Sequence, residues 1–431
     1  MLAVMKTALF APLALLLVAA APPATDNAVR VARVLKATPL IDGHNDWAEV
    51  LREREGDKRW TMDLRAGLGT LPKPYNTDIA RLREGMVGGQ FWSVYVDAAL
   101  PPLEQVKATL EQIDLIHDIV ARYPDTFALA RTADDVRRIH ARGRIASLIG
   151  VEGGNQIADS LSVLRAYHDL GAGYLTLTHA LTTDWGDSAT DDPKHGGLTP
   201  FGEAVVHELN RLGMLVDLSH VNEDVMRDAL RVSKAPVIFS HSSARALVDS
   251  PRDVSDDVLR LVAANGGVVM VNFAPGYVSE PRRLWGAEYA AEKTRLDAPP
   301  FGGLYIGQPD KAKAALAAWL KANPPPHVGM ADVADHIAHV AKVAGVDHVG
   351  IGSDFDGLGN ELPDGLRDVS TYPALLAELM RRGWSDADIT KLAGGNILRV
   401  MAAAEQVAAS MKDELPSTAV EATMDAGTVA K

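Results

Sequence analysis

The chain has 431 residues, which is enough for one large α/β barrel or for two ordinary domains. Hydrophobic residues make up 47% and charged residues 23%, and the formal net charge of −13 argues against nucleic acid and anionic membrane surfaces as partners, because both require a basic face. The chain contains no cysteine, so disulfides, thiolate metal ligands and a cysteine nucleophile are excluded.

Residues 1–24 are predicted to be a cleavable signal peptide. Lys6 precedes the apolar stretch 8–21, and small residues at Ala19 and Ala21 form a cleavage pattern just before a pair of prolines. The apolar stretch is too short to span a bilayer comfortably, although an uncleaved N-terminal anchor is the alternative. We therefore expect an exported protein, periplasmic or secreted, with no membrane anchor once the signal is removed.

Eight short apolar runs alternate with helical patterns along the rest of the chain. The runs occupy residues 39–46, 89–98, 145–152, 174–179, 214–220, 236–241, 267–273 and 348–354. Apolar residues at a spacing of three to four predict helices between most of the runs, with Thr199-Pro200 and Ser255 as two helix starts. This alternation predicts an α/β fold, a (β/α)₈ TIM-type barrel. The alternative is an open doubly wound sheet, which brings only two or three strand ends to one crevice.

The barrel domain is expected to span residues 25–408. Within it, residues 274–328 form a stretch far longer than an ordinary βα loop. We expect this stretch to act as a lid or as a wall of the substrate channel, with a short helix at 311–322. Residues 409–431 are polar with scattered small apolar residues, and we expect them to form a disordered tail.

Six of the eight runs end in residues that a two-metal hydrolase requires. The active site of a (β/α)₈ barrel lies at the C-terminal ends of the strands, which is where these residues fall. Four histidines, two aspartates and one glutamate are too many to explain as core residues. They are His44, Asp46, Glu152, His179, His220, His241 and Asp354.

Five of these residues are candidate metal ligands. His44 and Asp46 are two residues apart, so strand alternation points both to one side, although the local sequence also fits a simple turn. His220 and His241 end neighbouring strands about 4.8 Å apart and can reach one cation, the alternative being hydrogen-bonded core histidines. Glu152, flanked by glycines, is suited to bridge two metals, the alternative being a buried glutamate paired with an arginine.

Three residues are candidates for handling the substrate. Asp354 could hold the attacking water and carry its proton to the leaving amine, and Asp356 is its rival. His179 could stabilise the oxyanion, bind a metal, or be a core histidine. Arg252 could grip a substrate carboxylate at the rim of the site, but a rim arginine is usually a solvated ion-pair partner. No Gly-x-Ser-x-Gly motif and no lysine at a strand end offers a different chemistry.

The chain resembles the membrane dipeptidase (renal dipeptidase) family of zinc peptidases over residues 38–408. Eight short motifs carry the resemblance, and together they are highly specific. They are IDGHND at 41–46, GGQFWSVY at 88–95, GVEGG at 150–154, LTLTH at 175–179, DLSH at 217–220, FSHSS at 239–243, GIGSDFDG at 350–357 and GNILRV at 395–400.

The resemblance implies a barrel with a binuclear zinc centre, two Zn²⁺ per chain. His44 and Asp46 match the ligands of one zinc ion. His220 and His241 match the ligands of the other, and Glu152 matches the bridge between the two ions.

The resemblance also implies roles for the remaining three residues. His179 matches the residue that binds the substrate and the developing oxyanion, Arg252 the residue that contacts the substrate's carboxylate, and Asp354 the acid that handles the proton. The implied activity is zinc-dependent hydrolysis of dipeptides by a metal-bound hydroxide, including dipeptides with a D-residue at the C-terminal position.

Two departures from the family pattern lie near the expected pocket and leave the metal ligands untouched. Trp47-Ala48 stands where many members have Leu-Pro, and Asn155 stands where many have His. An N-acyl amino acid deacylase or lactonase on the same metal centre is the alternative function, and a non-catalytic binding protein is a third. Mammalian members are disulfide-linked dimers, but this chain has no cysteine, so only a non-covalent homodimer is open to it.

Overall fold

The computed structural model describes residues 24–359 and 361–425 of the chain. The predicted signal peptide lies, apart from Ala24, outside the described residues and stays a prediction. None of the helices within the described ranges is long and apolar enough to cross a membrane.

The strands of the described chain form one parallel sheet, and eight of them close into a barrel. The pairing of Asp42 in β1 with Ile351 in β9 closes the ring, so the predicted (β/α)₈ TIM-type barrel is confirmed. Each predicted run overlaps one barrel strand. The ninth strand, β3, pairs with the first residues of β4 and was not predicted, because a strand of three residues leaves almost no pattern. The strands are β1 (Leu40–Asn45), β2 (Val87–Tyr95), β3 (Phe127–Leu129), β4 (Ile145–Glu152), β5 (Ala172–Thr176), β6 (Leu215–Asp217), β7 (Ile238–Phe239), β8 (Val268–Val271) and β9 (Val349–Ile351).

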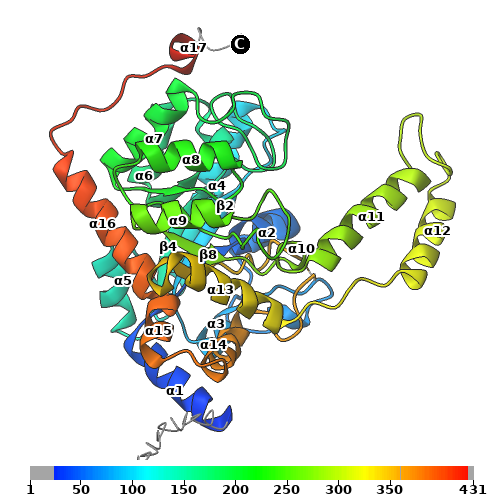
Figure 1. Cartoon of the computed structure of the whole chain (residues 1–431), viewed down its shortest axis with the longest axis horizontal. Coiled ribbons are helices and arrows are strands. Elements are labelled where there is room, and N and C mark those ends of the chain that lie inside the picture. The colour runs from blue at the N-terminus through cyan, green and yellow to red at the C-terminus, as the bar shows by residue number, and fades with distance from the viewer. Residues whose placement is uncertain (1–23, 360, 426–431) are drawn as a thin grey trace, which may run out of the picture.

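Helices connect the strands and cover the outside of the barrel (Figure 1). The two predicted helix starts are confirmed. The Thr199 side chain accepts a hydrogen bond from the backbone N–H of Gly202, and the Ser255 side chain accepts one from the backbone N–H of Val258. Each cap satisfies a backbone donor that the first helical turn leaves unpaired. The helices are α1 (Ala24–Ala37), α2 (Trp47–Glu55), α3 (Ile79–Glu84), α4 (Pro102–Arg122), α5 (Ala133–His140), α6 (Leu161–Asp169), α7 (Pro200–Leu212), α8 (Glu223–Val232), α9 (Asp256–Asn265), α10 (Pro275–Val278), α11 (Glu280–Leu296), α12 (Pro309–Ala322), α13 (Met330–Ala344), α14 (Tyr372–Arg381), α15 (Asp386–Thr390), α16 (Asn396–Ser410) and α17 (Glu421–Met424).

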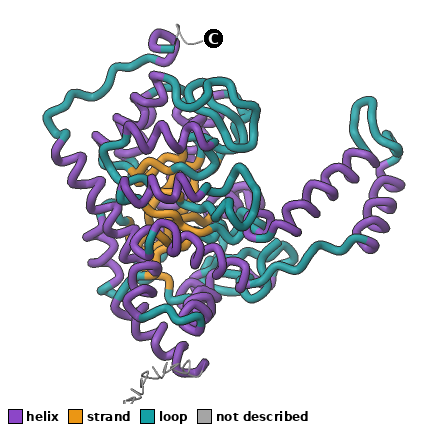
Figure 2. The backbone as a smooth tube through the Cα atoms, viewed as in Figure 1, coloured by secondary structure: helices purple, strands orange, loops and turns teal. Residues whose placement is uncertain are grey.

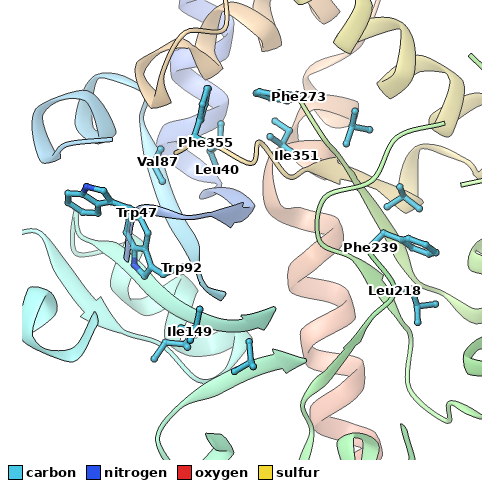
Figure 3. Close-up of a cluster of buried hydrophobic side chains, with 14 of the residues drawn as sticks. Leu40, Trp47, Val87, Trp92, Ile149, Leu218, Phe239, Phe273, Ile351 and Phe355 are labelled. Carbon is cyan, nitrogen blue, oxygen red and sulfur yellow. The ribbon is translucent and has the colours of Figure 1, made fainter. Parts of the chain in front are cut away.

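An apolar core holds the strands in register beneath their polar ends. Figure 3 shows part of it, including Trp47 and Trp92. The ring centroids of these two residues lie 5.4 Å apart. Ile149, Phe239 and Ile351 are also buried in this cluster. Burying each such side chain contributes about 1.5–3 kcal/mol to stability. The core therefore fixes the places from which the strand-end residues project.

The segment 274–328 contains α10, α11 and α12 where the sequence led us to expect mainly a long loop. The predicted helix at 311–322 corresponds to α12. Figures 1 and 2 show α11, α12 and the loop that joins them projecting away from the barrel as a hairpin. Trp285, Tyr289 and Trp319 pack together between the two helices, with ring centroids 5.3–6.1 Å apart. The role of this hairpin as a lid stays a prediction.

The described part of the predicted C-terminal tail contacts the barrel at several places, among them the ion pair of Glu414 with His207. Met411, just after α16, is only 2% exposed. The backbone N–H of Phe201 in α7 donates a hydrogen bond to Asp425 Oδ1. The disorder expected for residues 409–431 stays a prediction.

Candidate metal centre

The seven strand-end residues predicted from the sequence lie together at the C-terminal end of the barrel. Their ligand atoms form three overlapping groups, and within each group all atoms lie within 4.8 Å of one another. The groups are His44 with Glu152 and His241, Glu152 with His179 and His220, and His44 with Asp46 and Asp354.

Most of these side chains project from the residues just after the strands. Glu152 is the last residue of β4, whereas Asp46 begins α2 as its N-cap and is not part of β1. His220 and Asp354 have positive φ angles of 68° and 64°, so the chain turns sharply at both residues. Such conformations are costly for non-glycine residues and are concentrated at functional sites. Period-two alternation within strands therefore explains only part of the convergence.

Glu152 lies between two sets of ligand atoms. Its Oε2 is 3.3 Å from His44 Nε2, which is itself 3.3 Å from Asp46 Oδ1. Its Oε1 is 3.1 Å from His220 Nε2 and 3.2 Å from His241 Nε2. One oxygen of the carboxylate thus faces His44, which adjoins Asp46, and the other oxygen faces His220 and His241.

The donor atoms of this centre suit metal ions. His44 Nε2 and Asp46 Oδ1 are buried and have no hydrogen-bond partner among the described residues. The Nε2 atoms of His220 and His241 face each other at 2.9 Å. Buried polar atoms nearly always have partners, and a cation beside each of these two pairs would supply them. Imidazole nitrogens and carboxylate oxygens are common ligands of Zn²⁺.

Hydrogen bonds on the far side of two histidine rings orient them toward the centre. The Tyr174 hydroxyl lies 3.0 Å from His44 Nδ1 and donates to the carbonyl of Gly43, so it accepts the proton of Nδ1. Ser240 Oγ lies 2.8 Å from His241 Nδ1 and donates to Asp217. With Nδ1 protonated, Nε2 of each ring faces the centre and presents a lone pair to it when the ring is neutral.

Two buried aspartates that the sequence did not single out support this arrangement. Asp217 at the end of β6 accepts hydrogen bonds from Thr176, Ser219 and Ser240. Asp42 in β1 accepts hydrogen bonds from Gln90, Tyr372 and both the backbone and the side chain of Ser353. The sequence did contain one signal for them, an ionisable residue inside an apolar strand. A carboxylate buried there must have several hydrogen-bond partners, which indicates a structural role.

The charges of the centre favour most of its ligands in their metal-binding forms, with His44 as the exception. Burial lowers the pKa of His44, but the attraction of Glu152 outweighs it and raises that pKa well above that of a free imidazole. Burial raises the pKa of Glu152, but the attraction of His44 and His179 outweighs it and holds that pKa well below its usual range. Burial lowers the pKa values of His220 and His241 well below that of a free imidazole. A carboxylate and neutral imidazoles are the forms that bind metal ions.

A cavity of about 470 Å³ opens above the centre. His179 forms part of its wall, with Nε2 3.7 Å from Glu152 Oε1 and its ring 4.3 Å from the ring of Tyr95. Burial lowers the pKa of His179. An imidazole in this position can contact a ligand in the cavity as well as the carboxylate of Glu152.

The structure separates Asp354 from its rival, Asp356. Asp354 lines the cavity, and its Oδ2 accepts a hydrogen bond from Asn272 at 3.0 Å. Burial and the nearby Asp46 carboxylate raise the pKa of Asp354 well above its usual range. Asp356 instead accepts a hydrogen bond from the backbone N–H of Asn76, so it stabilises a loop. Burial also raises the pKa of Asp356, to about 6, so what separates the two aspartates is that Asp354 lines the cavity and Asp356 does not.

Arg252 lies deeper than the solvated rim where the sequence analysis placed it. It is 1% exposed, and its guanidinium donates hydrogen bonds to Ser242 Oγ and the carbonyl of His241. It also lies 5.6 Å from the ring centroid of Tyr277, which lines the cavity. The chain folds back after β7, so that Ala244 forms an isolated β-bridge with Val254. This turn buries Arg252 behind the cavity wall.

Comparison with known proteins matches residues 28–415 to the peptidase M19 family, the membrane dipeptidases. The chain is 41% identical over 394 residues to dipeptidase aclJ of Aspergillus oryzae, covering 89% of this chain and 82% of that protein. It is 39% identical over 399 residues to dipeptidase verJ of Clonostachys rogersoniana, covering 90% of each.

Solved structures of similar fold are matched over nearly their full lengths. The probable dipeptidase PvdM of Pseudomonas aeruginosa has a TM-score of 0.73 and 25% identity, covering 89% of this chain and 99% of that one. A metallopeptidase of Rhodobacter sphaeroides has a TM-score of 0.68 and 26% identity, covering 85% of this chain and 99% of that one. The latter was crystallised with a phosphinate mimic of the dipeptide L-Ala-D-Ala.

Proposed function

The chain belongs to the membrane dipeptidase family, peptidase family M19, and from this membership and the geometry of the strand ends we propose that it is an exported dipeptidase that works with two zinc ions. The family and its solved members make it a metallo-dipeptidase, a hydrolase of peptide bonds. The identity and number of the ions, the role of each residue and the export of the protein are our proposal.

The position of Glu152 between two pairs of ligand atoms carries this proposal. His44 and Asp46 would hold one ion on the side of Oε2. His220 and His241 would hold the other on the side of Oε1. Bound together, two metal ions supply an activated water and polarise the scissile carbonyl.

The chain's own residues orient the substrate and move the proton. His179 contacts the scissile carbonyl and stabilises the negative charge that develops on its oxygen. Asp354 accepts the proton of the attacking water on a carboxyl oxygen and passes it to the departing nitrogen. Arg252 draws the substrate's carboxylate toward the wall formed by Tyr277.

The proposed substrates are dipeptides, including those with a D-residue at the C-terminal position. The phosphinate mimic of L-Ala-D-Ala bound by the Rhodobacter sphaeroides metallopeptidase supports this choice. Export is supported by the sequence of residues 1–24 alone. A cleaved signal would be detected as a mature N-terminus close to α1.

One observation favours a second candidate function, the hydrolysis of N-acyl amino acids or lactones on the same metal centre. The segment that contains α10, α11 and α12 is long, and α10 lines the cavity directly. Because this segment shapes one wall of the pocket, it could admit an acyl chain in place of an amino-terminal residue.

A small substrate panel tests both functions. We expect zinc-dependent cleavage of an L,L-dipeptide and an L,D-dipeptide, and no cleavage of an N-acetylated amino acid or a tripeptide. Activity should vanish after chelation and return with zinc. Cleavage of the acetylated substrate alone would move the function to deacylation, and activity that survives complete metal removal would contradict the metal mechanism.

A further inference from the structure

The cavity above the candidate metal centre is acidic. Its described lining residues include five carboxylates and no lysine or arginine. Asp46, Glu152 and Asp354 belong to the groups of side chains that could hold metal ions. The other two carboxylates, Glu49 and Glu361, belong to none of these groups, so metal binding does not account for them.

Only one of these two carboxylates lacks a partner. Glu361 is 70% exposed and pairs with Arg282, which lies 2.6 Å away. Glu49 is partly buried and has no hydrogen bond or ion pair with any described residue. A partly buried carboxylate without a partner is costly, and a cationic group of a ligand beside it would supply that partner.

Glu49 belongs to an acidic stripe that leads out of the cavity along α2. Asp46, Glu49 and Glu53 are spaced three and four residues apart, which places them on one face of the helix. Glu53 is exposed to solvent. Tyr95 lines the same cavity as Glu49. A cation can therefore approach Glu49 from solvent between acidic groups and an aromatic ring.

The positive charge near the cavity, that of Arg252, lies on a different side of the barrel from Glu49. Arg252 and Tyr277 come from the segments after β7 and β8, whereas Glu49 follows β1. In the strand order of the barrel, β9 and β8 lie between β1 and β7. A substrate with its carboxylate toward Arg252 would therefore direct its amino-terminal residue toward α2.

We propose that Glu49 is a specificity-determining residue that binds the cationic side chain of the substrate's amino-terminal residue, so that the preferred substrates are dipeptides beginning with arginine or lysine. This inference rests on the proposed dipeptidase function and deepens it. A guanidinium beside Glu49 forms the charge-assisted hydrogen bonds that the carboxylate lacks. Glu53 contributes at longer range by attracting the cation.

The test compares arginyl-alanine with citrullinyl-alanine on the zinc-loaded full chain. Citrulline keeps the shape of arginine and lacks its charge, so the ratio of the two kcat/KM values isolates the ionic contact. We expect the wild type to favour the arginyl dipeptide by about tenfold or more. Glu49→Gln should bring this ratio close to one through a larger loss on the arginyl substrate. Glu53→Gln is the matched control on the same helix and should lower the ratio by about threefold at most.

Three results would overturn the inference. A wild-type ratio near one, with both dipeptides hydrolysed, overturns this inference but not the proposed dipeptidase function. This measurement tests the inference even where the Glu49→Gln protein fails to fold. Equal losses on both substrates in Glu49→Gln also overturn it, because Glu49 would then contact the α-ammonium group that both share. If the zinc-loaded protein hydrolyses no dipeptide, both the proposed function and this inference are overturned.

Discussion

The barrel end around Glu152 and the hairpin of α11 and α12 differ in how firmly their side chains are held. At the barrel end, Asp217 alone accepts four hydrogen bonds from three neighbouring residues. In the hairpin, Trp285 and Trp319 are half-buried and pack against each other and Tyr289, with few hydrogen bonds to hold them. Substitutions at the barrel end should therefore change chemistry and stability together, whereas those in the hairpin should change only local order.

The largest effect is expected at Glu152, because both candidate metal positions depend on it. Glu152→Gln keeps the shape of the side chain and removes its charge, so neither position retains a bridging anion. We expect zinc content, measured by mass spectrometry, to fall and kcat/KM to decrease by at least about 10³-fold. A protein that keeps two zinc ions and its turnover would contradict the bridge.

Glu208→Gln is the matched control for this variant. Glu208 is also fully buried, but it pairs with Arg165 and Arg211 on the outside of the barrel. Its loss should lower stability and leave zinc content unchanged. Loss of zinc in both variants would show that Glu152→Gln acts through folding instead.

The next largest effect is expected at Asp354. Its raised pKa and its hydrogen bond from Asn272 place a proton-holding carboxyl beside the centre. Asp354→Asn should keep both metal ions and lower kcat by about 10²–10⁴-fold, the usual contribution of a positioned acid or base. Asp356 accepts a hydrogen bond from the backbone N–H of Asn76 and does not line the cavity, so Asp356→Asn should have the smaller effect on kcat. The reverse order would exchange the roles of the two aspartates.

A moderate effect is expected at Asp217, which orients His241 through Ser240. Asp217→Asn places an amide N–H₂ among groups that themselves donate, so at least one buried donor loses its acceptor. We expect zinc affinity, measured by chelator competition, to fall about 10–100-fold and the free energy of unfolding to fall by about 1–3 kcal/mol. Ser240→Ala removes fewer hydrogen bonds and should cost less. Equal zinc affinity in wild type and Asp217→Asn would contradict the positioning role.

The sequence predicted the barrel and the convergence of its strand-end residues for a physical reason. A buried parallel strand is a nearly continuous apolar run, so a histidine or carboxylate at its end is conspicuous, and closure of the ring brings all such ends together. Asp217 escaped notice because its partners, Thr176 and Ser240, lie on neighbouring strands far away in the sequence. Contacts of this kind arise from strand order and register, which a local pattern does not contain.

Two other features needed the folded chain for the same reason. The burial of Arg252 depends on the turn that follows β7 and on Tyr277, which lies beyond β8. The helix α11 has no apolar face of the usual kind, since only Arg282 and Leu296 are buried along it. Without a periodic pattern, the sequence indicated a long insertion but not a hairpin.

The smallest effect is expected in the hairpin. Trp319→Ala removes one ring of the aromatic cluster with Trp285 and Tyr289, but the barrel core lies elsewhere. We expect the free energy of unfolding of the barrel to change by less than about 1 kcal/mol, against about 3–5 kcal/mol for Trp92→Ala in the core. Limited proteolysis should cut the loop between α11 and α12 faster in Trp319→Ala, because local opening costs less where few apolar contacts hold a segment. A large loss of barrel stability would instead show that the hairpin and the barrel unfold as one unit, and the contrast between the two regions would then fail.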